Sequence, residues 1–132
     1  MSDDSTPDNE YLLISRGQWD ADSSKEEIQA VIDEFYAWHE RLVGEGKFRP
    51  GQRLGTATQL VARTGITDGP FTESKEVIGG YWFVIASSLR EAAAIAADSP
   101  CLACGLSYEI RPIESERASA YRNGNETPGP SK

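Results

Sequence analysis

His39 is the only histidine in the chain, and it lies on a predicted helix one turn after Phe35. A histidine on the inward side of a helix, with a pKa of about 6.5, acts as a general base when a carboxylate orients its ring. Asp68 is the candidate carboxylate, because the Gly-Pro pair that follows it restricts the backbone there. These residues predict a catalytic dyad of His39 and Asp68. The alternative, which is the commoner situation, is that His39 packs against the core and donates to a backbone carbonyl.

A second group of ionisable side chains follows Asp68 closely. In an extended segment Glu73 and Lys75 point the same way and would bind a polar group of a ligand, with Glu76 next to them. Phe71 is the large apolar side chain that would hold this segment against the body of the protein. The alternative is a salt-bridged loop, or a contact in which Lys75 pairs across a subunit interface. Exposed ion pairs contribute only about 0–1 kcal/mol, so stability alone is a weak reason for the arrangement.

Two further residues are ligand-binding candidates, and two cysteines are not. Trp19 lies in a turn-rich connection and should either pack down, which we favour, or line a pocket. Arg111 is either a solvated residue of an edge strand or a residue whose guanidinium group binds a carboxylate ligand through two hydrogen bonds. Cys101 and Cys104 have the spacing of a redox or zinc pair, but they follow a helix instead of opening one, and zinc needs two more ligands. We therefore expect neither a metal nor a cofactor.

Composition limits the class of protein. The chain has 132 residues, of which 39% are hydrophobic, and this predicts one domain with a substantial core. Its net charge of −8 argues against a nucleic-acid partner, because such binding depends on Lys and Arg neutralising phosphates. No apolar run approaches the roughly 20 residues that span a bilayer, and the first residues do not resemble a secretion signal. We expect a cytoplasmic protein without a membrane anchor.

The hydrophobic pattern predicts the element order β-α-β-β-α-β. Strands are expected at residues 11–14, 58–64, 81–86 and 107–113, and the segment 48–54 is expected to be irregular. The first helix starts at Ser23 or Ser24, each followed three residues later by a glutamate, and the second starts at Ser88 with Glu91 as its partner. The inward side of the first helix is expected to carry one apolar stripe, with Trp38 at its edge: Ile28, Val31, Ile32, Phe35, His39, Leu42 and Val43.

The strand patterns predict a ferredoxin-like α+β fold with an antiparallel sheet. The first and third strands are continuously apolar, as central strands are, while the other two alternate as edge strands do. Both helices of this fold cover the same face of the sheet. The other face would then expose Tyr81, Phe83 and Ile85, a larger apolar patch than soluble monomers usually show. We expect a homodimer that buries this helix-free face.

One thirteen-residue segment also suggests a family. The run Asp68-Gly-Pro-Phe, followed by Glu73, Lys75-Glu76 and Gly79-Gly80-Tyr81, resembles the signature of DGPF proteins within the YCII-related family. The segment 108–113, Tyr-Glu-Ile-Arg-Pro-Ile, is similar to the last strand of that family. The likeness covers residues 10–113, between an N-terminal lead-in at 1–9, expected to be disordered, and a flexible tail at 114–132. It implies an α+β domain of the dimeric α/β-barrel type.

The resemblance leaves the reaction open, because members of the family are mostly of unproven function. One interpretation is a small-molecule-binding protein or enzyme with a cleft near the DGPF segment and the dimer interface. The other is a non-catalytic interaction module linked to transcription control, because some members lie beside or are fused to sigma-factor-like proteins. Fold alone does not choose between these functions, and the sequence does not say whether the protein is an enzyme.

Overall fold

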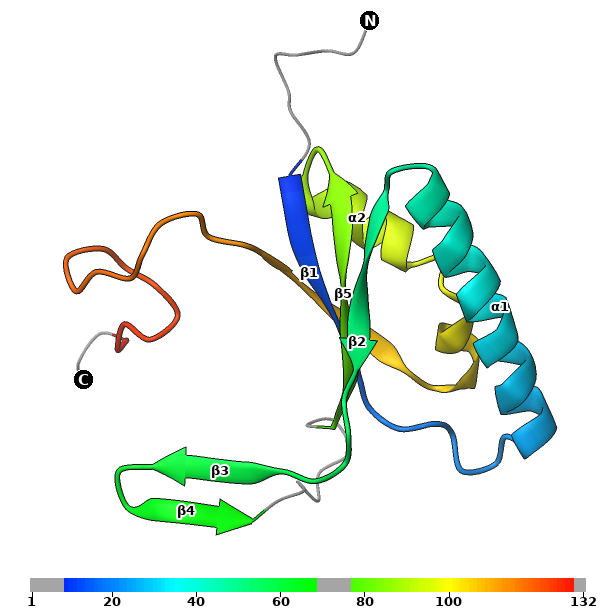
Figure 1. The fold of residues 1–132 in the computed structure, drawn as a ribbon, viewed down its shortest axis with the longest axis horizontal. Helices are drawn as coiled ribbons and strands as arrows, with labels where there is room; N and C mark the ends of the chain where they lie inside the picture. The colour runs from blue at the N-terminus through cyan, green and yellow to red at the C-terminus, as the bar shows by residue number, and fades with distance from the viewer. Residues whose placement is uncertain (1–8, 69–76, 130–132) are drawn as a thin grey trace, which may run out of the picture.

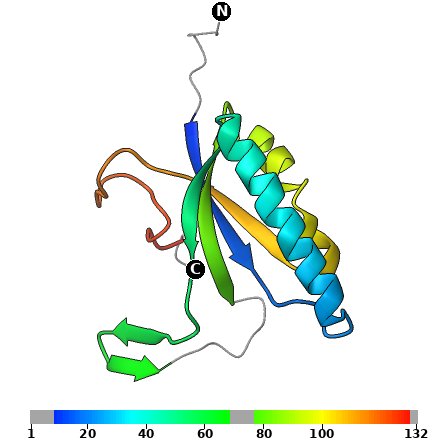
Figure 2. The same cartoon turned by 45° about the vertical axis from the view of Figure 1, so that its right-hand side comes forward.

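The computed structural model describes residues 9–68 and 77–129. Its main body is a four-stranded antiparallel sheet with both α-helices on one face (Figures 1 and 2). The elements of this body are β1 (Asn9–Arg16), α1 (Lys25–Gly44), β2 (Phe48–Arg53), β5 (Ile78–Ala86), α2 (Leu89–Ala96), a 3-10 helix (Pro100–Cys104) and β6 (Ser107–Pro112). A separate two-stranded sheet is formed by β3 (Gln59–Ala62) and β4 (Gly65–Asp68).

The strand order of the main sheet is β2-β5-β1-β6. β1 and β5 are therefore the central strands, as their continuous apolar sequences predicted, and the ferredoxin-like α+β fold is confirmed. In both strands the burial alternates along the chain. The buried set, which includes Leu13 and Val84, faces the helices, so the intervening side chains lie on the helix-free face.

The prediction for the second strand was wrong. The edge strand is β2, in the segment expected to be irregular, and it pairs with β5 despite Pro50 and Gly51. The pairing register shifts between Arg49 and Gln52, so the two breaker residues lie within a bulge, where an edge strand tolerates proline. The segment predicted as the strand, residues 58–64, instead forms most of the β3–β4 hairpin, which lies beyond the end of the sheet (Figure 1).

The helix starts were predicted well. Ser24 and Glu27 form the reciprocal capping box of α1, with hydrogen bonds of 2.8 and 3.0 Å. In α2 the Ser88 side chain accepts from the Glu91 backbone N–H, but the Glu91 carboxylate accepts from the backbone N–H and hydroxyl of the preceding Ser87. The second helix therefore has half of the predicted box.

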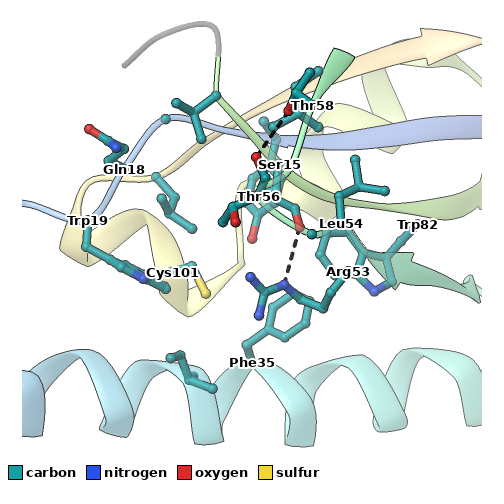
Figure 3. Close-up of a pocket in the computed structure, with 18 of the residues that line it drawn as sticks. Ser15, Gln18, Trp19, Phe35, Arg53, Leu54, Thr56, Thr58, Trp82 and Cys101 are labelled. Atoms are coloured by element: carbon teal, nitrogen blue, oxygen red, sulfur yellow. Dashed lines mark hydrogen bonds between the residues drawn. The ribbon is translucent and has the colours of Figure 1, made fainter. Parts of the chain in front are cut away.

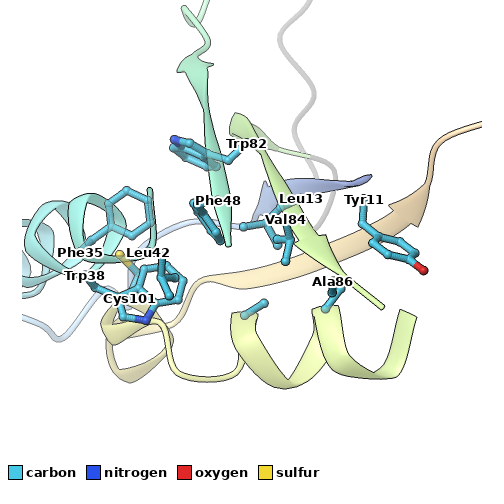
Figure 4. Close-up of a cluster of buried hydrophobic side chains, with 12 residues drawn as sticks. Tyr11, Leu13, Phe35, Trp38, Leu42, Phe48, Trp82, Val84, Ala86 and Cys101 are labelled. Atoms are coloured by element: carbon cyan, nitrogen blue, oxygen red, sulfur yellow. The ribbon is translucent and has the colours of Figure 1, made fainter. Parts of the chain in front are cut away.

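The apolar stripe of α1 is rotated from its predicted position. Trp38, placed at the edge of the stripe, is only 6% exposed, whereas Val43, placed within it, is 36% exposed. The reason is aromatic packing, because Trp38 meets the ring of Phe48 from β2 edge-on with 5.2 Å between ring centroids. The core between helices and sheet is shown in Figure 4, and its largest members are Tyr11, Leu13, Phe35, Trp38, Leu42, Phe48, Trp82 and Val84.

Candidate functional site

A cavity of about 780 Å³ opens between α1, one end of the main sheet and the segment 54–58 (Figure 3). Aromatic side chains form much of its wall. Trp19 comes from the β1–α1 connection, Phe35 and Tyr36 come from α1, and Trp82 comes from β5. Phe35 and Trp82 also contact each other edge-on, with ring centroids 5.2 Å apart, so two of the walls are fixed by the core itself.

The β1–α1 connection is held in place by backbone hydrogen bonds. Gly17, with φ of 92°, donates to the carbonyl of Val77 at 2.9 Å, and Asp20 donates to the carbonyl of Cys104 at 2.8 Å. These bonds lie on either side of Trp19, which packs against the core and also lines the cavity. The sequence predicted that Trp19 would either pack down or line a pocket, and in the structure it does both.

Three polar side chains lie at the inner part of the lining, namely Ser15, Cys101 and Tyr108. The Tyr108 hydroxyl is 2.7 Å from the hydroxyl of Ser99, which also accepts the backbone N–H of Cys101 at 3.3 Å. Burial raises the pKa of Tyr108. Burial also raises the pKa of the Cys101 thiol, and the hydrogen bonds of this thiol with Tyr108 and Ser99 oppose that effect. Both groups are therefore protonated at neutral pH, when they act as hydrogen-bond donors and not as bases.

Arg53 is the one charged residue among the described residues that line the cavity. It is the last residue of β2, and its Nε donates to the carbonyl of Gly79 at 3.3 Å. The cavity thus combines aromatic walls, neutral donors and one cation.

His39 lies outside this lining. Its ring packs between Phe35 and Phe48, with centroid distances of 5.9 and 5.5 Å, and its buried Nε2 has no hydrogen-bond partner in the part of the chain that the structure describes. Burial lowers the pKa of His39, and the neighbouring Glu40 carboxylate opposes that effect.

The structure does not bring His39 and Asp68 together. Asp68 ends β4, is exposed, and accepts a hydrogen bond of 3.0 Å from the Gln59 side-chain amide. Within the described residues, 9–68 and 77–129, no hydrogen bond or ion pair joins His39 to Asp68. The dyad stays a prediction.

The remaining predicted site residues lie away from the cavity or outside the described residues. Arg111 donates to Glu109 at 3.0 Å, and Glu109 also accepts from Arg16 at 2.8 Å. This group is on β1 and β6, and none of its members lines the cavity. The other ligand-binding candidates fall outside the described residues: Phe71, Glu73, Lys75 and Glu76.

Sequence reasoning missed Arg53 and Tyr108. Arg53 fell within the segment expected to be irregular, and Tyr108 was assigned to one face of an alternating strand without a role. The available signal was the run 53–58, Arg-Leu-Gly-Thr-Ala-Thr, which places a cation at the end of β2 and two threonine hydroxyls shortly after it. Whether such a run faces a cavity depends on tertiary packing.

The described residues contain no group of three or more His, Cys, Asp or Glu side chains that would hold a metal ion. No helix within the described ranges is both long enough and apolar enough to cross a membrane.

We expect the imidazole of His39 to titrate below 6.5, its ordinary pKa, because burial disfavours the charged ring. As the pH falls below this value the unfolded chain takes up the proton first, so the folded state loses stability until its own, lower pKa is passed. NMR titration of the single histidine, in wild type and Asp68→Asn, measures the shift. An equal pKa in the two proteins is the expected result, and a raised pKa that drops in Asp68→Asn would establish the dyad.

Comparison with known proteins identifies the family. Residues 10–115 match the YCII-related domain. The chain is also 35% identical over 97 residues to an uncharacterised protein, R00369, of Rhizobium meliloti (strain 1021), and the aligned part covers 68% of this chain and 78% of that protein. The residues matched by the family domain include both helices, the four strands of the main sheet and the residues that line the cavity. The chain therefore belongs to the YCII-related domain family.

Proposed function

We propose that this protein binds a small organic molecule in the aromatic-walled cavity and works as a homodimer. The observation that carries the proposal is the cavity itself. Its volume of about 780 Å³ lies within the range of roughly 300–1,000 Å³ that is typical of small-molecule sites. Such sites combine mainly apolar walls with a few convergent polar groups, and here Ser15, Tyr108 and Arg53 supply the polar groups.

The supply of protonated donors favours binding over acid–base catalysis. Tyr108 and Cys101 keep their protons at neutral pH, because burial raises the pKa of both groups. Among the described lining residues there is no carboxylate or imidazole to accept a proton. A catalytic version of this proposal would need a base brought in by the ligand or by another part of the chain.

The homodimer is proposed from the helix-free face of the sheet. Cross-strand neighbours Leu12 and Phe83, and likewise Ile14 and Tyr81, place an apolar patch over the two central strands. The rings of Tyr81 and Phe83 meet edge-on at 6.0 Å, and the Arg49 guanidinium lies 4.1 Å from the centroid of Phe83. Burial against the same patch of a second copy would remove this surface from water.

Charged pairs border the apolar patch on both sides. Arg49 pairs with Glu10 at the β2 side, and Arg16 pairs with Glu109 at the β6 side. Each pair carries both signs of charge, so a second copy would meet both signs at the border of the patch. This arrangement supports an isologous dimer.

The β3–β4 hairpin extends towards the same side. Figures 1 and 2 both show it beyond the end of the sheet and turned away from the helices. Val61 and Ile66 are paired across it and are 77% and 66% exposed. An isolated two-stranded hairpin is marginally stable in water, so contact with the second copy would give it the packing that its own protomer does not supply.

Filling the cavity should abolish binding of a neutral apolar dye. Ile32 lines the cavity from α1, so Ile32→Trp places a large side chain in the space that a ligand would occupy. We expect N-phenyl-1-naphthylamine to gain fluorescence in the wild-type protein, and the variant to weaken its binding by about tenfold or more, which corresponds to 1.4 kcal/mol of binding free energy.

The matched control is Ala37→Trp. Ala37 is on the same helix, is exposed, and does not line the cavity, so this variant should bind the dye as the wild type does. Equal dye affinity in wild type, Ile32→Trp and Ala37→Trp would place the dye elsewhere and refute the cavity as the ligand site.

A further inference from the structure

We infer that the ligand is an aromatic carboxylate, or a similarly flat organic anion, whose acidic group is bound by Arg53 at the cavity mouth. This inference rests on the proposed function of the cavity and names the chemical class of its ligand. It is carried by the charge of the lining, by the free hydrogen-bonding capacity of Arg53, and by the shape of the walls.

The charge of the lining is opposite to that of the whole chain. The protein has 21 acidic and 13 basic residues, with a net charge of −8. The described residues of the cavity nevertheless contain no acidic side chain, and Arg53 is their single charge. A single cation in a lining without carboxylates attracts an anionic ligand, although the chain as a whole is negative.

Arg53 differs from the other arginines of the sheet because it has no carboxylate partner among the described residues. Arg16, Arg49 and Arg111 each form an ion pair with a glutamate. Arg53 instead makes one hydrogen bond, from Nε to the carbonyl of Gly79, and no described carboxylate lies within 4.0 Å of it. The two terminal nitrogens therefore have no partner among the described residues, and they form the fork that binds a carboxylate through two parallel hydrogen bonds.

Strand pairing holds Arg53 in position. It lies opposite Gly80 in the β2–β5 ladder, and the next residue, Leu54, donates to the carbonyl of Gly79 at 2.9 Å. A Cβ at Gly80 would come within 2.8 Å of the Gln52 carbonyl, so the absence of a side chain there permits the close pairing of the strands. The guanidinium group is thus attached to a fixed part of the backbone, at the exposed end of the cavity.

The walls favour a flat ligand. Rings from Trp19, Phe35, Tyr36 and Trp82 line the cavity, and aromatic rings pack best against other rings in stacked or edge-on arrangements. With the acidic group bound at Arg53, the ring system of the ligand would extend between these side chains. Tyr108 is also in the lining, with its hydroxyl hydrogen-bonded to that of Ser99.

Three probes of one shape test the inference: 2-naphthoate, 2-naphthalenemethanol and 2-naphthylmethylammonium. Their dissociation constants are measured by quenching of tryptophan fluorescence and by calorimetry. We expect the carboxylate to bind about tenfold more tightly than the neutral alcohol, as one charge-assisted bidentate contact allows, and the ammonium to bind most weakly. Arg53→Gln should remove the preference, so that the carboxylate binds no more tightly than the alcohol.

Arg90→Gln is the control for net charge. Arg90 is exposed on α2 and does not line the cavity, so this variant should keep the full preference for the carboxylate. Arg53→Lys, which keeps the charge without the fork, should retain part of it. Equal affinity for carboxylate and alcohol, or a preference that survives in Arg53→Gln, would overturn the inference while the cavity proposal stands. If none of the three probes binds the wild type, the cavity proposal fails and the inference fails with it.

Discussion

Replacement of Gly51 by alanine is expected to destabilise the protein by about 3 kcal/mol, within the upper range for single substitutions that introduce a backbone clash. A Cβ at Gly51 would lie 1.8 Å from the carbonyl oxygen of Tyr81 and 2.9 Å from the Cα of Trp82. Both contacts are to backbone atoms of the central strand β5, which cannot move aside as a flexible side chain would. The bulge that joins β2 to the sheet would therefore have to open.

Gly55→Ala is the matched control, because a Cβ at Gly55 would meet no atom within 4 Å. Urea or thermal unfolding should place Gly55→Ala near the wild type and Gly51→Ala well below it. Since Arg53 is two residues further along β2, Gly51→Ala should also weaken binding of 2-naphthoate. Equal melting temperatures for the two variants would contradict the close approach of β2 to β5.

If the proposed homodimer forms through the helix-free face, Phe83→Glu is expected to convert it into a folded monomer. Phe83 lies on the helix-free face, opposite Leu12 in the β1–β5 ladder and beneath the Arg49 guanidinium. A carboxylate there remains hydrated in a monomer but would be buried, together with its symmetry mate, in a dimer formed through this face. Light scattering should give about twice the chain mass of 14.4 kDa for the wild type and about one chain mass for the variant.

The control for this substitution is Leu89→Glu. Leu89 is 46% exposed at the start of α2, on the helix side of the sheet, so a glutamate there should leave the dimer intact. Circular dichroism of both variants separates a change of assembly from a loss of folding. A monomeric wild type at micromolar concentration, or a Phe83→Glu protein that remains dimeric, would refute the proposed interface.

Local sequence signals predicted most of the fold. The uninterrupted apolar sequences around Leu13 and Val84 identified the central strands. A strand has apolar side chains on both of its faces when both faces are buried. The start of α1 was predicted at Ser23 or Ser24, and the second of these forms the cap with Glu27, because both halves of such a cap lie within four residues of sequence.

The errors concern elements whose structure depends on distant residues. Pro50 and Gly51 have the composition of a chain break, yet the strand continues through them because β5 supplies the partner and Gly51 fits against Tyr81. The segment 58–64 alternates as an edge strand should, but β2 occupies the edge position beside β5, and residues 59–62 pair with β4 instead.

The site was predictable only in part. Trp19 was selected because a large aromatic in a turn-rich connection needs a surface to pack on, and it does line the cavity. Arg53 and Tyr108 come from strands on opposite edges of the sheet, so their common position follows from the strand order and not from spacing along the chain. His39 has a suggestive position on the helix, but its orientation towards Phe48 is set by the packing of β2 against α1.

The most direct test of the ligand cavity uses the three tryptophans as internal probes. Trp19 and Trp82 line the cavity, whereas Trp38 is buried in the core and does not line it. The three indole N–H signals of the ¹⁵N-labelled protein, assigned by single Trp→Phe variants, are followed by NMR as 2-naphthalenemethanol is added. If the cavity is the ligand site, Trp19 and Trp82 will show saturable shifts that are much larger than the shift for Trp38. Shifts confined to Trp38, or no saturable shift at any of the three, would contradict it.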